Sequence, residues 1–478
     1  MKSIDTIYIK GQFVAPHGTE RFTLIDPVTE QASAQVILAD EVDAETAITA
    51  ATLAYHELAD SSRVQRMDWL ARLHKVVADA EEELVATMID EYGGPHAISV
   101  ATSKRAAASF DQARTLLSDY QFERQVASAR VRMEPLGVVG LITPWNANYG
   151  MICSKLAMAI AAGSTAVIKP SELSARQTDL LTHVLHRADL PPGLFNILTG
   201  RGDVVGAALV RHPGIAKISF TGSTAVGKSI VRSCADSLKR VTLELGGKSP
   251  TVLLDDADFG KAMPLIAAAA TINSGQACLA GTRLLVPRAR LQEAEQGIVA
   301  AFAALTVGDP RDPATRIGPM VSATQYQRVQ GYIRKGIEEG ATLLLGGTGL
   351  PDGLERGYFV RPTIFSNVRN DMTIAREEIF GPVLSVIAYD DEEDAIAIAN
   401  DTIYGLHANV FSGDVARANR VARRIQAGRV FINGLYDEPM APFGGFKQSG
   451  LGREFGVFGL EEYLEPKTLL GYEQSLST

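Results

Sequence analysis

A cysteine among small residues is the first position in this sequence that suggests covalent chemistry. Cys278 lies in the run NSGQACLAG (residues 273–281), where glycine and alanine leave room for a substrate to approach the sulfur. The usual partner of such a nucleophile is histidine, but none of the eight histidines has an obvious catalytic context. A helix N-terminus or a nearby cation also favours a thiolate. Cys278 is therefore the candidate nucleophile, whereas Cys153 and Cys234 lack glycine-rich surroundings and are expected to be structural.

Two further side chains stand where strands are expected to end. Glu244 precedes two glycines in ELGGK (residues 244–248), where its carboxylate can act as a general base toward water, especially if partial burial raises its pKa. A surface or ion-paired carboxylate is the alternative for this residue. Asn146 ends the run TPWN, and its amide can donate to an oxygen that becomes negative during a reaction. A turn asparagine is the alternative there, so the set of three is more persuasive than any member.

A different chemistry is suggested by FTGSTAVGKS (residues 220–229), which matches the phosphate-loop pattern G-x-x-x-x-G-K-[ST] letter for letter. The run TVLLDD (residues 251–256) then offers a carboxylate for magnesium. An ATPase that uses residues 222–229 is therefore an alternative function. That carboxylate follows Ser229 after unusually little intervening structure, and Lys228 fits a solvated first helical turn equally well, so we favour the cysteine chemistry.

Composition excludes several classes of partner. The 478-residue chain is 46% hydrophobic and 21% charged, as expected for a globular enzyme of two or more domains. Its net charge of −9 argues against nucleic acid and acidic membranes, because a polyanion offers nothing for excess carboxylates to neutralise. No secretory signal or run of about 18 apolar residues occurs. Three cysteines suit a reducing compartment. We expect a cytoplasmic protein with a small-molecule substrate, no nucleic acid and no membrane partner.

The elements that must position these residues follow from periodicity. Apolar residues recur at helical spacing over residues 42–58 and 62–92, until Gly93, Gly94 and Pro95 end the second helix. The polar, arginine-bearing segment 118–135 alternates like a strand without a strong buried face, which predicts a ribbon that packs on another subunit.

Short β-branched runs separated by helix-length segments predict two parallel sheets with helices on both faces. In the first region the runs are residues 137–146, 164–172, 193–200, 216–223 and 241–247. In the second region they are residues 251–256, 284–287, 381–389, 407–412 and 429–433. The strands end in turn residues and polar groups, where the ligands of such sheets bind.

Seven motifs then occur in one order along the chain: TPWN, KPSE, FTGS, ELGGK, GQACLAG, EEIFGPV and PFGGFKQSGLGRE. With them the chain resembles the aldehyde dehydrogenase superfamily from about Tyr8 to Leu470. The resemblance implies an α/β fold with three parts: a variant Rossmann dinucleotide-binding domain (residues 1–117 and 136–246), a second α/β catalytic domain (residues 247–448), and a small β oligomerisation element (residues 118–135 and 460–478). A homodimer or homotetramer is implied as well.

The same resemblance implies a mechanism without a metal. Cys278 would attack the aldehyde carbon, and the side chain of Asn146 with the Cys278 backbone N–H would hold the oxyanion. Hydride transfer to a nicotinamide would leave a thioester, and Glu244 would activate the water that releases the acid. The alternative is the CoA-acylating branch of the family, against which Glu244 argues because that branch generally lacks the water-activating glutamate.

Cofactor contacts are implied residue by residue. Lys169, also carried over among the catalytic residues, and Glu172 resemble the pair that binds the adenosine ribose. Glu378 and Phe380 resemble the clamp on the nicotinamide ribose and ring. Ser223 resembles a phosphate contact at a helix N-terminus. The other expected contacts are Thr143, Pro144, Trp145, Ser171, Gly222, Gly227, Leu245 and Gly246. Because the Glu172 carboxylate repels a 2′-phosphate, we expect NAD to be preferred over NADP.

The expected substrate pocket departs from the family pattern. After TPWN the family often has a large aromatic residue and then proline, but here four other residues follow: Ala147, Asn148, Tyr149 and Gly150. Ala147 and Gly150 are expected to widen the substrate tunnel, and Asn148 or Asp437 to make it more polar, which suggests a larger or partly polar aldehyde. Compensating side chains that refill the space are the alternative. The remaining expected wall residues are Ile272, Leu279, Tyr436 and Phe443.

Overall fold

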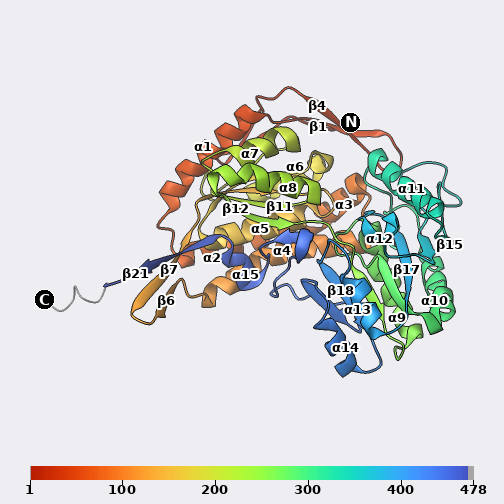
Figure 1. Ribbon diagram of the computed structural model, residues 1–478. Helices are drawn as coiled ribbons and strands as arrows, with labels where there is room; N and C mark the ends of the chain where they lie inside the picture. Colours follow the sequence, from red (N-terminus) through yellow and green to blue (C-terminus); the bar gives the residue numbers. More distant parts are fainter. Residues whose placement is uncertain (1, 472–478) are drawn as a thin grey trace.

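The computed structural model describes residues 2–471, and within them the chain forms two large sheets, each covered by helices (Figure 1). The predicted α/β class is confirmed. Two smaller sheets accompany them. One lies near the N-terminus, with strand order β1 (Lys2–Ile4), β5 (Ala32–Ile37) and β4 (Arg21–Ile25). Within the described residues, no helix is both long and apolar enough to cross a membrane.

The first large sheet contains the five strands predicted for the first region, all parallel to one another. They are β8 (Val138–Ile142), β9 (Thr165–Lys169), β10 (Phe195–Ile197), β11 (Lys217–Thr221) and β12 (Arg240–Glu244). The sheet order is β20-β12-β11-β8-β9-β10-β2-β3. Antiparallel strands close both edges: β2 (Ile7–Ile9), β3 (Gln12–Val14) and β20 (Gly450–Leu451).

The second large sheet has the order β15-β16-β17-β14-β13-β18-β19. Its six parallel strands are β13 (Pro250–Leu253), β14 (Arg283–Pro287), β16 (Thr363–Ser366), β17 (Val383–Tyr389), β18 (His407–Phe411) and β19 (Arg429–Ile432), and five of them were predicted. The strand β15 (Thr342–Leu345) is antiparallel at one edge. β16 had no counterpart among the predicted runs.

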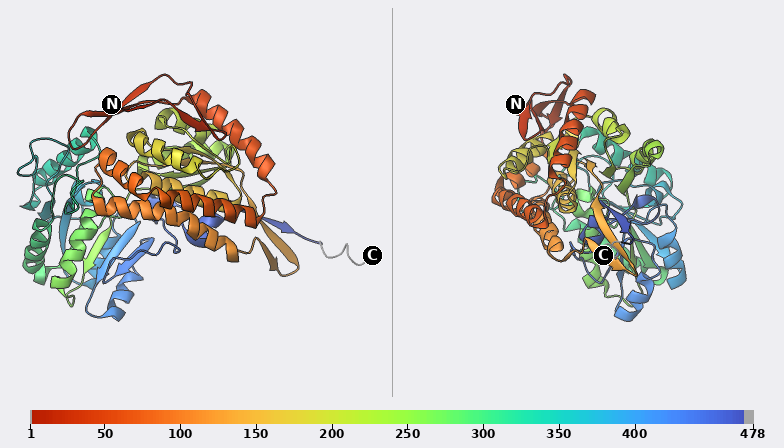
Figure 2. Two further views of the ribbon diagram at one scale, coloured as in Figure 1. Left: turned by 180° about the vertical axis from the view of Figure 1, so that it is seen from behind. Right: turned by 90° about the vertical axis from the view of Figure 1, so that its left-hand side faces the viewer.

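Helices cover both sheets (Figures 1 and 2). Beside the first sheet are α1 (Glu41–Leu58), α2 (Arg63–Asp79), α3 (Glu81–Tyr92), α4 (His96–Asp119), α5 (Asn148–Ala162), α6 (Ala175–His186), α7 (Ala207–Arg211) and α8 (Thr224–Cys234). Beside the second are α9 (Phe259–Thr271), α10 (Leu291–Ala303), α11 (Ala323–Glu338), α12 (Thr373–Arg376), α13 (Glu392–Asn400) and α14 (Val415–Ala422). The short helix α15 (Gly456–Glu461) packs against α5.

Local sequence explains the helix boundaries near the N-terminus. Asp40 and Asp43 form a capping box at α1, and Ser62 and Gln65 form another at α2, so each pair satisfies backbone N–H groups that the helix leaves free. The single helix predicted over residues 62–92 is divided, because Ala80 leaves the helical conformation between α2 and α3.

The predicted ribbon is a hairpin that extends away from the rest of the molecule (Figures 1 and 2). It consists of β6 (Glu123–Val126) and β7 (Ala129–Pro135). The strand β21 (Leu464–Leu469), from the C-terminal region of the chain, pairs with the other edge of β7. β6 is exposed along its whole length. Residues 472–478 of the predicted oligomerisation element lie outside the described residues, and its role in assembly stays a prediction.

Candidate active site

A short buried segment joins the two large sheets and places Glu244 at their junction. Glu244 is the last residue of β12, where it pairs with Thr221 on one side and with Gly450 of β20 on the other. The chain then crosses to β13 of the second sheet. Glu244 is 2% exposed, and within residues 2–471 neither carboxylate oxygen has a hydrogen-bond partner. A buried carboxylate without partners is unusual outside functional sites, since its desolvation is not compensated.

The surroundings of Glu244 make it a stronger base than a surface carboxylate. Burial raises the pKa of Glu244 well above its usual value, and the nearby Glu454 carboxylate raises it further. The cations Lys155, Arg453 and Arg429 act in the opposite direction. Backbone also approaches it closely, because a Cβ built on Gly444 would lie 2.7 Å from Glu244 Oε1.

The loop that carries Cys278 is fixed by buried hydrogen bonds. After α9, Asn273 and Ser274 adopt positive φ angles of 52° and 59°, which turn the chain sharply. The side chain of Gln276 then donates to the Tyr92 hydroxyl and to the Pro319 carbonyl, each at 3.2 Å. Its amide oxygen accepts from the backbone N–H of Val321 at 3.0 Å. Contacts to three separate segments therefore hold this loop in place.

Asn146 both donates a hydrogen bond to this loop and accepts one from it. Its side-chain nitrogen donates to the backbone carbonyl of Gln276 at 2.9 Å, and the Asn273 amide donates to the Asn146 carbonyl at 3.0 Å. An amide nitrogen carries two hydrogens, so the bond to Gln276 leaves the second one for another acceptor. Asn146 is therefore bonded to the residue two positions before Cys278, and its role beside the thiol stays a prediction.

The Cys278 thiol lies within electrostatic range of two carboxylates. Desolvation raises the pKa of the Cys278 thiol above its usual value, and the charges of Glu378 and Glu244 raise it further. The backbone N–H groups of Cys278 and Leu279 act in the opposite direction. The Cys278 carbonyl oxygen also faces the crossing segment, since a Cβ on Gly247 would come within 2.4 Å of it. Cys153 and Cys234 are buried in the core, in agreement with the structural role expected of them.

Glu378 and Phe380 approach from the second sheet. A carboxylate oxygen of Glu378 accepts the backbone N–H of Gly247 at 3.1 Å, and burial raises the pKa of Glu378 to about 7. A Cβ on Gly246 would lie 2.5 Å from this carboxylate, so a side chain there would displace Glu378. Phe380 meets Trp145 edge to face, with ring centroids 5.5 Å apart. Residues predicted from both halves of the chain thus meet at the junction.

Lys169 and Glu172 form an ion pair at the end of β9. Their charged groups lie 3.4 Å apart, with Lys169 buried and the Glu172 side chain 22% exposed. Burial lowers the pKa of Lys169, while Glu172 and Asp203 raise it. Ser171 starts the helical turn that carries Glu172 by accepting the Leu173 N–H at 3.3 Å. Nearby strand ends carry the buried hydroxyls of Thr143 and Thr221, which have no partner among the described residues.

The phosphate-loop match is not a phosphate loop. Ser223 caps α8, which starts at Thr224, so Gly227, Lys228 and Ser229 lie inside the helix rather than in a loop around an anion. Gly227 instead allows close packing, because a Cβ there would lie 2.6 Å from the Leu245 side chain. Gly222 is the turn between β11 and this helix.

The carboxylate expected to serve that loop is also elsewhere. The run TVLLDD starts in β13 of the second sheet and extends beyond it, and Asp256 accepts hydrogen bonds from Ser412 and from the Asp414 N–H. The ATPase alternative is therefore wrong.

The predicted substrate-pocket residues divide into two groups. Ala147, Ile272, Leu279 and Phe443 are partly exposed; the first three lie at the start of α5, after α9 and next to Cys278, and Phe443 lies between β19 and β20. Phe443 precedes Gly444, which contacts Glu244, and its ring packs against Phe455 at 5.9 Å. Asp437 is exposed and pairs with Arg105 of α4 at 2.8 Å. Tyr436 is also exposed and donates to the Ile432 carbonyl.

Two expectations about the pocket are wrong. Asn148 does not make it more polar, because the side chain is fully buried and donates to the hydroxyls of Ser174 and Thr178. Gly150 does not open space, since a Cβ there would lie 3.3 Å from Thr102 of α4. The tightly packed α4, which had no counterpart among the predicted helices, fills the volume that Gly150 was expected to leave.

Sequence reasoning missed two charged residues beside Glu244. Lys155 lies on the inner face of α5 and forms a buried ion pair with Glu454. A lysine within the apolar run of α5 was the available signal, because a charge is rarely buried without a partner.

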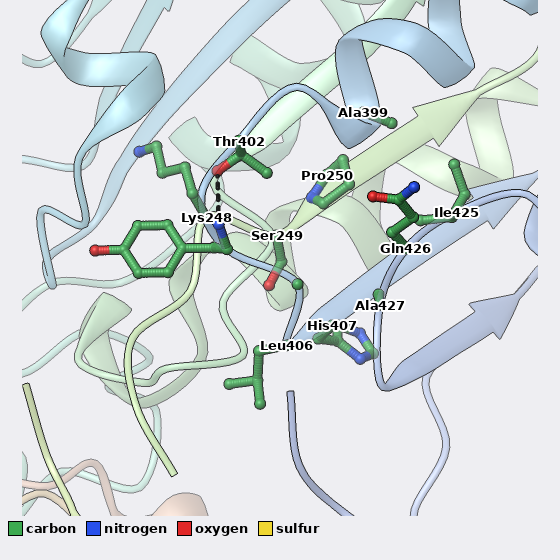
Figure 3. Close-up of a pocket in the computed structure, with 12 residues that line it drawn as sticks. Lys248, Ser249, Pro250, Ala399, Thr402, Leu406, His407, Ile425, Gln426 and Ala427 are labelled. Atoms are coloured by element: carbon green, nitrogen blue, oxygen red, sulfur yellow. Dashed lines mark hydrogen bonds between the residues drawn. The ribbon is translucent and has the colours of Figure 1, made fainter. Parts of the chain in front are cut away.

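A small pocket borders the crossing segment at Lys248 and Ser249 (Figure 3). Lys248, Ser249 and Pro250 line one wall, and Leu406 and His407 line another. The Lys248 ammonium has no hydrogen-bond partner among the described residues, and burial lowers its pKa to about 7. None of the predicted site residues lines this pocket.

Comparison with known proteins agrees with this arrangement. The sequence model of the aldehyde dehydrogenase family matches residues 13–469. The chain is 44% identical over 478 residues to 3-succinoylsemialdehyde-pyridine dehydrogenase from a Pseudomonas species, covering 99% of this chain and all of that one. It is also similar to a cysteine-to-alanine mutant of aldehyde dehydrogenase C from Pseudomonas syringae, solved with NAD+ and octanal.

For that structure the identity is 44%, the TM-score is 0.96, and 98% of this chain and 97% of the other are covered. A Mycobacterium tuberculosis aldehyde dehydrogenase in complex with NAD+ is 37% identical with a TM-score of 0.95, covering 98% of this chain and 99% of that one. Identity at this level over nearly the whole length of each chain shows the family as well as the fold. The chain belongs to the aldehyde dehydrogenase family.

Proposed function

We propose that the protein oxidises an aldehyde to its carboxylic acid with NAD, using Cys278, Asn146 and Glu244. The observation that carries this proposal is the hydrogen bond from Asn146 to the backbone of the Cys278 loop, with Glu244 acting electrostatically on the same thiol. These two relationships support a site to which three separate elements contribute. The similar Pseudomonas syringae enzyme, solved with NAD+ and octanal, supports the same cofactor and substrate class.

The residues around the junction fit a dinucleotide. Lys169 and Glu172 offer a donor and an acceptor for ribose hydroxyls, and the exposed N-terminus of α8 at Ser223 suits a pyrophosphate. Glu378 and Phe380 would hold the nicotinamide end, opposite Trp145. The remaining residues expected to contact the cofactor would contribute backbone groups or the space left by glycine. They are Pro144, Ser171, Gly222, Leu245 and Gly246. The unpartnered hydroxyls of Thr143 and Thr221 support the fit, since buried polar atoms normally have a partner.

The reaction begins with attack of the Cys278 sulfur on the aldehyde carbon. The thiol proton leaves to water at the partly exposed cysteine, so Glu244 remains unprotonated and available as the base for the second half of the reaction. The free N–H of Asn146 and the Cys278 backbone N–H then stabilise the negative oxygen that develops on the former carbonyl. When bound, NAD supplies the acceptor for the hydride that leaves this carbon. The acyl group remains on Cys278 as a thioester.

Release of the acid requires water, and Glu244 is the residue that can activate it. Water attacks the thioester carbon while Glu244 takes one of its protons, which restores the thiol after the carbon–sulfur bond breaks. This step assigns the protein to the hydrolytic branch rather than the CoA-acylating branch. Formation of the acid in the absence of CoA is the expected result, and a strict CoA requirement would exclude the hydrolytic assignment.

The cofactor preference follows from one carboxylate. Glu172 is partly exposed at the end of β9, where it would face the ribose. A 2′-phosphate there would meet a like charge, which supports NAD over NADP.

The substrate is proposed to be longer than a short aliphatic aldehyde. Ala147 leaves one wall small where the family often carries an aromatic residue, while Ile272, Leu279 and Phe443 offer apolar contacts. The octanal and pyridine-bearing semialdehyde in the names of two similar proteins support this direction. Fastest turnover of acetaldehyde or propionaldehyde in a chain-length series would contradict it.

The domain organisation and assembly are proposed on the same basis. Residues 1–117 and 136–246 would form the cofactor domain and residues 247–448 the catalytic domain, supported by the crossing between the two sheets. The projecting hairpin, with residues 460–478, would join subunits into a dimer or tetramer. Three unpaired cysteines support a reducing, cytoplasmic location.

The central test compares the wild-type enzyme with Cys278→Ala. NADH formation from a panel of aldehydes should be lost in the variant, while NAD binding measured by calorimetry should be retained. Cys153→Ala is the matched control, because that cysteine is buried in the core. Aldehyde oxidation that persists in Cys278→Ala would contradict the mechanism.

A further inference from the structure

A cluster of charged side chains surrounds the ion pair of Lys169 and Glu172 at the ends of β9 and β10. Arg201 lies beyond β10, where its Nε donates to Glu20 Oε1 at 2.7 Å and its Nη2 donates to the same oxygen. The side chains of Arg201 and Glu20 are 38% and 48% exposed. Glu20 directly precedes β4, so this second ion pair connects the N-terminal sheet to the first large sheet.

Backbone hydrogen bonds fix the position of this second pair. The N–H groups of residues 38–39 donate to the Glu20 carbonyl at 2.8 Å and to the Thr199 carbonyl at 2.9 Å. The same short segment therefore holds Glu20 on one side and the chain that leads to Arg201 on the other. Phe22, two residues after Glu20, places its ring 5.7 Å from the Arg201 guanidinium carbon. The guanidinium is thus held by a carboxylate and an aromatic ring of the N-terminal sheet.

The chain that follows Arg201 packs directly on Lys169. The Arg201 carbonyl accepts the Gly206 N–H at 3.3 Å, which closes the helical turn of residues 202–206. A Cβ built on Gly202 would lie 4.0 Å from the Lys169 ammonium nitrogen, and one built on Gly206 would lie 3.8 Å from Lys169 Cδ. Arg201 is therefore the residue next to a direct contact of Lys169, and the two cations belong to one surface.

The charges on this surface do not balance. Two cations, Lys169 and Arg201, stand against three carboxylates, Glu20, Glu172 and Asp203, which leaves an excess of one negative charge. The hydrogen bond from Arg201 lowers the pKa of Glu20, so this carboxylate is ionised at neutral pH. A further anion that approached the cluster would therefore meet net repulsion, although two basic side chains are present.

The bonding of Arg201 decides what this arginine can do. A guanidinium binds phosphate well because its planar group offers parallel N–H donors to two oxygens. One edge that can do so is formed by Nε and Nη2, and in Arg201 both nitrogens of this edge donate to Glu20. As long as Glu20 is ionised, a phosphate must displace it before it can use this edge of Arg201.

We propose that Arg201 is a latent anchor for a 2′-phosphate and that Glu20, by holding its guanidinium, selects NAD over NADP together with Glu172. The inference rests on the proposed function, because it takes Lys169 and Glu172 as the residues that bind the adenosine ribose. Glu172 acts by direct repulsion of the phosphate. Glu20 acts through Arg201 and is therefore a positioning residue for cofactor choice.

The test measures binding of 2′,5′-ADP and of 5′-AMP to the full-length protein by calorimetry. Glu20→Gln should bind 2′,5′-ADP about tenfold more tightly than wild type, because a neutral amide competes poorly with a phosphate for Arg201. Its affinity for 5′-AMP should be unchanged. The gain for 2′,5′-ADP should shrink at high salt, since salt screens exposed charges.

Glu293→Gln is the matched control. Glu293 of α10 accepts from Nε and Nη2 of Arg290, at 2.9 and 2.7 Å, so the substitution removes the same kind of partner from an arginine beside the second sheet. Its affinity for both nucleotides should equal that of the wild type.

Further variants separate the anchor from a simple loss of negative charge. When Glu20→Gln is combined with Arg201→Ala, the gain in 2′,5′-ADP affinity should disappear. Combination with Arg201→Lys should restore part of it, because an ammonium still attracts phosphate as a point charge. Glu20→Gln combined with Glu172→Gln should bind 2′,5′-ADP more tightly than either single variant. The ratio of kcat/KM for NADP to that for NAD should rise in the same order.

Equal affinity of wild type and Glu20→Gln for 2′,5′-ADP would overturn the inference. If the melting temperature of Glu20→Gln then fell, the pair would only hold the N-terminal sheet in place. A gain of the same size with Arg201→Ala present would also overturn it, since the gain would not depend on the guanidinium. Failure of the proposed function is distinguishable, because the wild type would then bind neither 5′-AMP nor NAD and would form no NADH.

Discussion

The side-chain nitrogen of Asn146 donates a hydrogen bond at 2.9 Å to the backbone carbonyl of Gln276, two residues before Cys278. The loop that follows β8 is thereby fixed to the loop that carries the sulfur, although the two are far apart in sequence. One bond serves two purposes. It positions the thiol, and it orients the remaining N–H of the amide, which is available to the substrate oxygen.

Asn146→Ala should lower kcat about 10²- to 10³-fold, because the oxyanion loses a preorganised donor. The slow step should be NADH formation itself, so the burst in rapid mixing should disappear. Asn146→Asp is the control for shape, and it should be at least as slow because it places a negative charge beside the oxyanion. A burst of unchanged rate in Asn146→Ala would exclude the amide from this role.

Glu244→Gln should still form NADH in the first turnover but release the acid slowly. Glutamine cannot take the proton of water, whereas attack of the thiol on the aldehyde retains another route for proton loss to solvent. Acyl-enzyme measured by mass spectrometry should therefore accumulate. Unchanged steady-state turnover would remove Glu244 as the obligatory base.

Gly444→Ala should damage the same step without removing the carboxylate. A methyl group at this position would lie 2.7 Å from Glu244 Oε1, and Gly444 has a φ of 149°, which an L-residue rarely adopts. We expect acyl-enzyme decay to slow while the melting temperature falls by a few degrees. Gly331→Ala on α11 is the matched control, because a Cβ there meets no atom within 4 Å. Equal decay rates in the two variants would show that displacement of Glu244 has no effect.

Glu172→Gln should improve the use of NADP relative to NAD. Removing the carboxylate abolishes its repulsion of a 2′-phosphate. It also leaves Lys169, whose ammonium lies 3.4 Å from the Glu172 carboxylate in the wild type, as an unpaired cation. The ratio of kcat/KM for the two cofactors measures the effect, which we expect in the KM for NADP rather than in kcat. An unchanged ratio would mean that the preference is determined elsewhere.

Glu91 is expected to make the stability of the protein depend on pH. It is 3% exposed, accepts the N–H groups of Arg176 and Gln177, and has a pKa raised by burial to about 7 from 4.5. Because the folded state holds the proton more tightly, the contribution of Glu91 to stability is full below pH 4.5. This contribution to the free energy of unfolding, roughly 3 kcal/mol, is lost as the pH rises through 7.

The melting temperature of Glu91→Gln should therefore be lower than that of the wild type at pH 5. The difference between the two melting temperatures should be smaller at pH 8. Glu83→Gln, an exposed glutamate on the same helix, should show no such trend. A constant difference between wild type and Glu91→Gln at the two pH values would contradict the assignment.

Much of the fold was predictable because it depends on local pattern. Apolar strands flanked by turn residues are visible in sequence, and all ten strands predicted for the two large sheets are present. The division of one helix at Ala80 was not predictable, since nothing in the pattern around it interrupts the apolar spacing. Helix α4 was missed because alanine and serine on its buried face give weak periodicity.

The site was only partly predictable, for a related reason. Motif residues such as Cys278 can be recognised in sequence, but their contacts depend on tertiary structure. The outcome at Gly150 depends on Thr102 in a different helix, so a missing side chain did not produce a cavity. Lys217 was likewise invisible as a buried charge, because a lysine at the start of a strand is usually solvated, and here Glu462 approaches from the C-terminal region.

The two-residue strand β20 has a consequence for synthesis of the protein. It borders β12 and pairs Gly450 with Glu244, so the strand that carries the glutamate has an open edge until the C-terminal segment has left the ribosome. A nascent chain that ends before Gly450 would expose that edge and leave Lys155 without Glu454. Oxidation of aldehydes should therefore begin only after nearly the whole chain has been translated, and the unfinished chain is the state in which a chaperone would be needed most.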